Sequence, residues 1–369
     1  MRLRTLDVLL AILVAYMGVR LLAPFPQAAQ WAGAGALVVL FLLMPRSWWV
    51  RKDARLWKVM LPWVATGFFS WLLVLTLARD LLLLAARPFL DTATHAAWTQ
   101  LSALAVIGLT PAITAAGFFM ARRVAAVRHV EVRVEGLAEG LNGFTIAQIT
   151  DIHVGPTIKG DFVQRIVERV NGLEADMVAI TGDLVDGSVR ELAAHTAPLA
   201  HLRSRHGTYV VTGNHEYYSG ATAWITELRR LGTRVLVNEH IVIEHGGAQL
   251  AVAGVTDYSA HHFDPGHRSD PHQALFGAPA DAMKVLLAHQ PRSAPQAQAA
   301  GAHLQISGHT HGGQFWPWNH FVRLQQPFTA GLHRLGQMWI YISSGTGYWG
   351  PPMRFGIPSE ITRIRLVRG

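Results

Sequence analysis

Long runs of apolar residues dominate the first third of the chain. Four of them approach or exceed the roughly 20 residues that a helix needs to cross the hydrocarbon core of a bilayer. The pattern therefore predicts four transmembrane helices, at about residues 6–23, 28–45, 60–84 and 99–121. The first run has a basic start, as a secretory signal does, but a second apolar run follows at once without a convincing cleavage site, so we expect it to be retained.

From about residue 129 the pattern changes to short β-rich runs separated by glycines, polar loops and amphipathic segments. Apolar residues recur at helical spacing in residues 161–173, and residues 222–231 predict a second helix. An apolar run of strand length follows each of them, which indicates an α/β layered domain. We place a transmembrane anchor in residues 1–125 and a second, soluble domain in residues 126–369.

The charges follow the same division. Residues 1–125 carry 12 Lys or Arg and four Asp or Glu, whereas residues 126–369 carry 20 of each, so the net charge of +8 lies in the apolar part. A basic protein often binds nucleic acid, but these basic residues flank apolar runs, which indicates membrane topology instead. The chain has no cysteine, which excludes disulfides, thiolate metal ligands and a cysteine nucleophile.

Clusters of basic residues predict the orientation in the membrane. They lie before the first apolar run, between the second and third, and after the fourth: Arg2 and Arg4; Arg46, Arg51, Lys52, Arg55 and Lys58; Arg122, Arg123 and Arg128. Under the positive-inside rule both termini are cytoplasmic. We therefore expect a multi-pass protein of the plasma (inner) membrane whose soluble domain faces the cytoplasm.

One ionisable pair, Arg79 and Asp80, lies within or at the edge of the third apolar run. Such a pair can mark a functional site inside the membrane. We expect instead that the helix reaches the interface near Leu77 and that the pair meets lipid headgroups. Few other polar residues occur in the four runs, so we interpret them as an anchor and not as a transport path.

Five predicted strands of the soluble domain end in residues that bind metals. The strands cover residues 145–150, 177–181, 208–212, 284–288 and 303–307. The polar residues that follow them are Asp151, His153, Asp183, Asn214, His215, Glu216, His289, His309 and His311. Open α/β sheets build their sites at the carboxyl ends of strands. Glycines precede three of these groups and allow sharp turns and close packing.

The chemistry of these side chains is consistent with a pair of cations. Imidazole and carboxylate are usual ligands for Mn, Fe, Co, Ni or Zn. Two divalent ions about 4 Å apart need a shared ligand, and Asp183 is the natural bridge, while Asn214 adds an oxygen without adding charge. Each motif alone is a weak signal, and Gly-Asp is ordinary turn chemistry. The prediction rests on all five occurring at strand ends.

The motifs resemble those of the calcineurin-like metallophosphoesterase family, over about residues 130–369. The segments ITDIHVG, ITGDLVDG, GNHEYYSG, AHQP and SGHTHGGQ look like the branch that carries N-terminal membrane helices, some of whose members are thought to act on lipids. The resemblance implies a four-layer α-β-β-α sandwich. It also implies a hydrolase with two divalent metal ions, which could be Mn, Fe, Zn, Co or Mg.

The resemblance also implies roles for individual residues. The first metal would be held by Asp151, His153, Asp183 and His311, and the second by Asp183, Asn214, His289 and His309. His215 would contact the phosphate and protonate the leaving oxygen, and Glu216 would orient His215. Glutamate replaces the aspartate that is more frequent there in the family. The expected reaction is hydrolysis of a phosphate ester or pyrophosphate by a hydroxide that bridges the two metals.

Several features favour a lipid-linked substrate and the lipid bilayer as a partner. Aromatic residues follow the last histidine motif in residues 314–318, and Tyr348 and Trp349 could extend that rim. Tyr217 and Tyr218 could stack on a substrate group, and the polar segment 257–272 could cover the site. Tethering to a bilayer also raises the effective concentration of membrane-borne substrates.

Three other interpretations remain open from the sequence. The protein could act on a soluble phosphodiester such as a nucleotide, since this fold serves many substrates. It could be a non-catalytic membrane scaffold, against which the intact ligand positions argue. It could be a transporter with a regulatory domain, but polar sites within the membrane are nearly absent.

Overall fold

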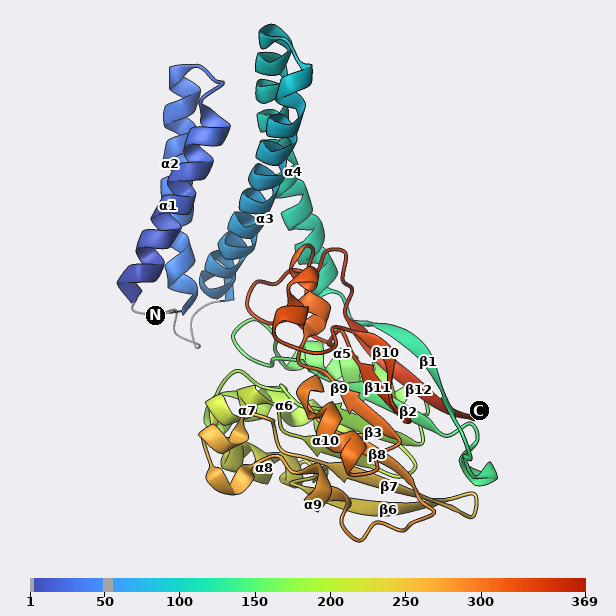
Figure 1. Cartoon of the computed structure of the whole chain (residues 1–369). Coiled ribbons are helices and arrows are strands. Elements are labelled where there is room, and N and C mark those ends of the chain that lie inside the picture. The colour runs from blue at the N-terminus through green and yellow to red at the C-terminus, as the bar shows by residue number, and fades with distance from the viewer. Residues whose placement is uncertain (1–2, 49–55) are drawn as a thin grey trace. The chain divides into compact units, whose positions relative to one another are not determined.

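The computed structural model describes residues 3–48 and 56–369 (Figure 1). It divides into two compact units: residues 1–122 with 350–355, and residues 123–349 with 356–369. Four of the basic residues that predict the orientation lie outside the described residues: Arg2, Arg51, Lys52 and Arg55.

The first unit contains four long helices: α1 Leu3–Leu22, α2 Gln27–Leu43, α3 Leu56–Ala86 and α4 Thr92–Arg122 (Figure 1). All four are long and apolar enough to cross a membrane by length and composition. Large apolar side chains are exposed on each of them, including Val19, Trp31, Leu82 and Phe119. Exposed apolar surface on this scale is typical of contact with lipid. The prediction of four apolar helices is confirmed.

The environment of Arg79 differs from our expectation that this side chain would contact lipid headgroups. The α3 helix continues past Leu77 to Ala86, and Arg79 is only 4% exposed. Its guanidinium group donates hydrogen bonds to Ser102 Oγ and to the carbonyl oxygen of Thr99, both on α4. The headgroup interpretation is therefore wrong for Arg79, because a neighbouring helix covers the side chain and satisfies its donors.

The second unit contains two mixed six-stranded sheets. The first has the order β1-β12-β2-β3-β4-β5 and the second has the order β10-β11-β9-β8-β7-β6. Strands β2, β3 and β4 are mutually parallel in the first sheet, as are β7, β8 and β9 in the second. The bounds are β1 Ala126–Val134, β2 Thr145–Ile149, β3 Met177–Thr181, β4 Thr208–Val211, β5 Arg234–Val235, β6 Glu239–His245, β7 Ala248–Gly254, β8 Met283–Leu287, β9 Leu304–Ser307, β10 Gly331–Leu335, β11 Met338–Ile342 and β12 Glu360–Arg368.

The main core lies between the two sheets and follows from the alternation of side chains along each strand. On β8, Val285 and Leu287 join a buried cluster with residues of the first sheet such as Ile146. Leu286 and Ala288, which alternate with them, join a second cluster on the other face. Both faces of this strand are thus apolar. This is expected for a strand with helices packed on one face and a second sheet packed on the other.

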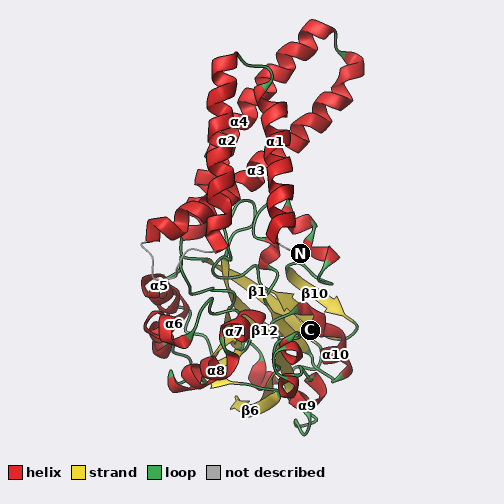
Figure 2. Ribbon diagram, turned by 90° about the vertical axis from the view of Figure 1, so that its left-hand side faces the viewer, coloured by secondary structure: helices red, strands yellow, loops and turns green. Residues whose placement is uncertain are grey.

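Helices cover the outer faces of both sheets. Figure 2 shows α5, α6 and α8 to one side of the strands and α9 and α10 to the other. Their bounds are α5 Gly160–Asn171, α6 Val189–Thr196, α8 Ala221–Arg230, α9 Pro271–Leu275 and α10 Ala294–Ala299. The second unit is therefore the four-layer α-β-β-α sandwich that the resemblance implied.

Candidate metal centre

The predicted metal ligands come from loops at the ends of β2, β3, β4, β8 and β9. Strands from both sheets therefore contribute to one cluster of side chains. Among the described residues, three groups of carboxylate and imidazole atoms lie close enough to hold a metal ion. Two contain the predicted ligands, Asp151 with His153 and His311, and Asp183 with His289 and His309, and the third combines His153 with Asp186 and His215. The structure thus brings together residues that are as far as 160 positions apart in the sequence.

The backbone at these ligands is unusual. Among the described residues, eight that are not glycine have a positive φ, and five of those eight are predicted ligands. They are Asp151, His153, Asp183, His309 and His311, with φ between 50° and 70°. The Cβ atom of any residue other than glycine makes this backbone conformation unfavourable. It persists only where the surrounding structure enforces it, and such residues often lie at functional sites.

Three glycines make the close approach of these loops possible. A Cβ atom on Gly213 would collide with the carboxylate of Asp183, and one on Gly308 would collide with that of Asp151. A Cβ on Gly182 would collide with the backbone of Gly213. The glycines of the sequence motifs are therefore required because the ligand loops pack directly against one another.

The first ligand group is almost fully buried. Asp151 Oδ1 lies 3.4 Å from His311 Nε2, and His311 Nε2 lies 3.1 Å from His153 Nε2. The backbone N–H of His309 donates to both carboxylate oxygens of Asp151 at 3.0 Å. Three potential ligand atoms thus converge on one small volume, held in place by a backbone donor.

The second ligand group shares the geometry of the first. Asp183 Oδ2 lies 3.1 Å from His289 Nε2, which in turn lies 3.2 Å from His309 Nδ1. Asp183 Oδ2 is also 3.9 Å from His153 Nε2 of the first group. Asp183 therefore lies between the two groups, which is the position that a bridging ligand needs.

Facing imidazole nitrogens provide a chemical test of the metal assignment. His153 Nδ1 lies 3.1 Å from Asp186 Oδ1, and His289 Nδ1 lies 2.8 Å from the carbonyl oxygen of Thr181. Both partners are acceptors, so each Nδ1 carries a proton, and each Nε2 presents a lone pair to the cluster when it carries no proton. Lone pairs that face other ring nitrogens repel unless a cation or proton lies among them. The donor set therefore fits a metal ion.

Asn214 adds an independent observation. Its side-chain oxygen is buried and has no hydrogen-bond partner among the described residues. Buried polar atoms are rarely left unsatisfied, and such an atom often indicates an absent ion or water. Asn214 lies at the start of α7 (Asn214–Ser219), shortly after β4, and the backbone N–H of the next residue, His215, donates to Asp183 Oδ1. An amide oxygen in this position is suited to be a neutral metal ligand.

The ionisable groups of the cluster shift one another's pKa values. Burial lowers the pKa of His289, but the carboxylates of Asp183 and Asp151 outweigh it and raise that pKa well above its usual range, so a cation would take the place of a proton on His289. Burial raises the pKa of Asp183, but the charges of His289 and other histidines outweigh it and hold the pKa well below its usual range. Burial and the neighbouring His289 lower the pKa of His309 to about 3. At neutral pH Asp183 is therefore ionised and His309 is neutral, which are the states that bind metals.

Comparison with known proteins identifies the domain. Residues 144–313 match a family model described as calcineurin-like phosphoesterase. An uncharacterized metallophosphoesterase of Campylobacter jejuni is 34% identical over 266 residues, which cover 71% of this chain and 69% of that protein. The chain belongs to the calcineurin-like phosphoesterase family. Phosphoesterases of this family are metal-dependent hydrolases.

Two further proteins are similar to parts of this chain. A transmembrane protein with metallophosphoesterase domain from Danio rerio is 39% identical over 266 residues, which cover 70% of this chain and 61% of that protein. The chain thus matches about three fifths of the length of that relative. Among solved structures, the NAD nucleotidase of Haemophilus influenzae has a TM-score of 0.40 at 15% identity, and the match covers 56% of this chain and 50% of that one. The four apolar helices and the named relatives indicate a membrane protein.

Beside the ligand groups of this phosphoesterase lies His215, the predicted proton donor. Its Nε2 is 4.0 Å from Asp183 Oδ2, and its Nδ1 is 2.6 Å from Asp186 Oδ1. Burial lowers its pKa, but the hydrogen bond to Asp186 and the charge of Asp183 outweigh burial and raise it to about 9. His215 is therefore protonated at neutral pH, with Nε2 directed toward the ligand cluster.

The sequence interpretation missed Asp186. Its Oδ1 contacts both His153 and His215, so one carboxylate orients a predicted ligand and the predicted proton donor. The only signal in the sequence was a second aspartate three residues after Asp183, and aspartate is common in turns. Its importance depends on the direction in which the loop points the side chain.

Glu216 has a different environment from the one expected. We expected it to orient His215, but that contact is made by Asp186. Glu216 is 1% exposed, and its carboxylate accepts hydrogen bonds from the backbone N–H groups of Asp183, Leu184, Val185 and Gly213. Glu216 therefore ties the loop after β3 to the loop after β4. The longer glutamate side chain can span these two loops.

Substitution of Asp186 tests its positioning role. Asp186→Asn is expected to lower turnover by about 10- to 100-fold, the usual effect of losing a carboxylate that orients a ligand or catalytic histidine. Loss of the negative charge also lowers the pKa of His215, so the alkaline limb of the pH–rate profile should move to lower pH. A profile with an unchanged alkaline limb would assign Asp186 a purely structural role.

The remaining predicted features surround this cluster. The Tyr217 hydroxyl lies 2.9 Å from His267 Nδ1, which connects the segment 257–272 to α7. The exposed rings of Tyr218 and Trp349 both pack edge-on against His215, with centroids 5.1 and 5.8 Å away. Gln314 exchanges side-chain hydrogen bonds with the backbone of Trp349, and these bonds hold the Trp349 loop beside the last histidine motif.

Proposed function

We propose that this phosphoesterase uses two divalent cations to hydrolyse a lipid-linked phosphate ester or pyrophosphate at the cytoplasmic face of a membrane. The residues that would hold the cations are Asp151, His153, Asp183, Asn214, His289, His309 and His311. The observation that supports this assignment is that two ligand groups converge, with Asp183 between them. When bound, the cations supply Lewis-acid chemistry: they lower the pKa of a water molecule and offset negative charge on the phosphate.

The residues of the chain supply the proton for the leaving group. His215 is protonated at neutral pH and points Nε2 toward the ligand cluster, so it donates that proton to the leaving oxygen as the ester bond breaks. Asp186 holds the other ring nitrogen and stabilises the charged imidazole. Glu216 keeps the loops after β3 and β4 in register, so that Asp183 and His215 remain at their present separation.

The proposal of a lipid-linked substrate is based on the side chains that surround His215. A leaving group must lie beside the proton donor, and the exposed side chains there are aromatic. Tyr218 is 61% exposed and Trp349 is 44% exposed, although both contact the His215 ring. Phe263 extends this surface, with its centroid 5.4 Å from that of Tyr218. Exposed aromatic surface favours an apolar or interfacial group over a highly charged one.

The membrane anchor supports the same substrate class. Four apolar helices tether the catalytic unit to a bilayer, so a substrate in that bilayer is present at high effective concentration. The basic residues Arg46, Lys58 and Arg122 lie on one side of the predicted membrane spans, and the catalytic unit follows the last of them in the sequence. By the positive-inside rule this side is cytoplasmic.

The experiment is a comparison of substrates with the full-length protein in vesicles, with added Mn, Zn, Fe and Mg in turn. We expect hydrolysis of phospholipids or nucleotide-activated lipids in preference to soluble nucleotides, and hydrolysis of a membrane-impermeant substrate only in inside-out vesicles. Trp349→Ala is expected to raise KM for the lipid substrate about tenfold, since a large aromatic contact is lost. It should affect a soluble aryl phosphodiester much less.

Phe276→Ala is the control, because Phe276 is an exposed aromatic residue (86%) just after α9, outside the predicted aromatic rim. Preference for a soluble nucleotide over every lipid would contradict the lipid proposal while leaving the metal centre intact. Hydrolysis by right-side-out vesicles would contradict the orientation. Inactivity toward all substrates with every metal would favour a non-catalytic scaffold.

A further inference from the structure

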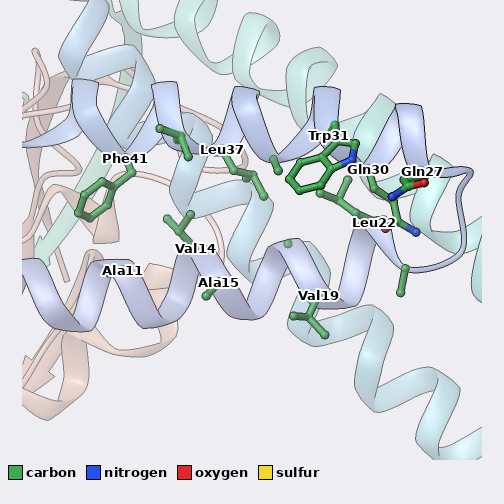
Figure 3. A pocket seen from close by; sticks show the side chains of 14 residues that line it. Ala11, Val14, Ala15, Val19, Leu22, Gln27, Gln30, Trp31, Leu37 and Phe41 are labelled. Atoms are coloured by element: carbon green, nitrogen blue, oxygen red, sulfur yellow. The ribbon is translucent and has the colours of Figure 1, made fainter.

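Two of the pockets in the first unit differ greatly in character. One, of about 660 Å³, lies between α1 and α2, and all the residues that line it are uncharged (Figure 3). Small and apolar side chains such as Ala15, Leu37 and Phe41 form its walls. The other, of about 840 Å³, is lined by residues of α1, α3 and α4 and contains Arg20, Arg79 and Arg87. Arginines are rare among membrane helices, so the second pocket requires an explanation.

The charges in this second pocket do not balance. Three guanidinium groups line it with only one carboxylate, that of Asp80. Asp80 is already engaged: Arg20 and Arg79 donate hydrogen bonds to it at 2.6 and 2.8 Å, and the Tyr16 hydroxyl donates a third at 2.7 Å. Two positive charges are therefore in excess, which favours an anionic ligand.

Arg87 is the guanidinium group available to a ligand. It is exposed, and no side chain in the described part of the protein forms an ion pair with it. His95 and Gln100 also line this pocket and add polar groups near it. The walls include Val19, Leu83 and Leu84, so apolar surface continues away from the charged end.

The depth of the pocket in the membrane matches that of lipid phosphates. Arg20 lies two residues before the end of α1 at Leu22, and Arg87 directly follows the end of α3 at Ala86. The charged groups are thus near the helix ends that face away from the 44–56 connection. Lipid phosphates lie just outside the hydrocarbon core. An arginine fork pairs with phosphate in a bidentate manner, which a simple point charge cannot do.

We propose that this pocket binds the phosphate group of an anionic phospholipid headgroup. The excess of two positive charges selects a lipid with net negative charge over a zwitterionic one, and the apolar walls contact its acyl chains. Arg87 provides the principal contact, and the network of Tyr16, Arg20, Asp80 and Arg79 holds the three helices in the required arrangement. The site is separate from the metal centre, and its proposal does not depend on catalysis.

The test uses the full-length protein in nanodiscs of phosphatidylcholine, with or without phosphatidylglycerol. Native mass spectrometry then measures the phosphatidylglycerol that remains bound to each protein. We expect the wild-type protein to retain this lipid, and Arg87→Gln to bind it about tenfold more weakly, since a charge-assisted bidentate contact is lost. Arg87→Lys keeps the charge without the fork and should fall between the two. Inorganic phosphate added to phosphatidylcholine discs tests a soluble source of the same group.

Arg46→Gln is the matched control. Arg46 is exposed and lies just after α2, at the opposite helix ends, and does not line the pocket. Arginines near any helix end can attract anionic lipid without a defined site. Equal losses in Arg46→Gln and Arg87→Gln, or equal retention of the two lipids by the wild-type protein, would overturn the proposal. Equally strong, Arg87-dependent binding of inorganic phosphate would overturn the assignment to a lipid.

Discussion

Asp183→Asn is expected to remove most of the bound metal and to lower turnover by at least about 1,000-fold. Asp183 lies between the two ligand groups, 3.1 Å from His289 Nε2 and 3.9 Å from His153 Nε2. An amide in its place keeps the size of the side chain but removes the charge that, in the proposed centre, would hold two cations together. Metal ions stabilise the transition state of phosphoryl transfer by several kcal/mol. Loss of this stabilisation corresponds to a decrease in turnover of about 1,000-fold or more.

Metal content by elemental analysis and turnover of an aryl phosphodiester would be measured on the same preparations. Asp161→Asn is the control, because Asp161 is an exposed carboxylate on α5, outside both ligand groups. Circular dichroism would establish that each variant is folded. An Asp183→Asn protein with a full complement of metal and normal turnover would remove the basis for a binuclear centre.

His215→Gln is expected to lower turnover by about 100- to 10,000-fold while metal content stays near that of the wild-type protein. The loss is the usual contribution of a general acid. Metal should remain because the substitution leaves unchanged both groups that contain Asp151 and Asp183, although His215 itself groups with His153 and Asp186. The alkaline limb of the wild-type pH–rate profile should reflect the His215 pKa, which is raised to about 9, because only the protonated ring donates.

Substrates with different leaving groups test the role of His215 as a general acid more directly. An ester of an acidic phenol leaves without a proton, so His215→Gln should be impaired much less with it than with an alkyl ester. His201→Gln, at an exposed position outside all groups of potential metal ligands among the described residues, is the control. Equal impairment with both leaving groups would show that His215 does not act as the acid. Loss of metal from His215→Gln would make it a ligand instead.

The sequence by itself determined the elements and the ligand candidates. Four apolar runs predict four helices because their length and composition are local properties. The strands before Asp151, Asp183 and His289 can be recognised from short apolar runs that end in ligand residues. Glycines in the motifs predict that the loops pack closely. The structure confirms this, because a Cβ atom on Gly308 would collide with Asp151.

Only the tertiary structure decided which partners these side chains meet. Asp186 reaches two histidines, and Glu216 binds backbone amides across two loops, because the loops after β3 and β4 lie side by side. Arg79 is buried because α4 covers it. Residues 350–355 group with the N-terminal helices, where Met353 accepts a hydrogen bond from Trp71. Each of these contacts joins segments distant in the sequence, and local periodicity carries no information about such pairs.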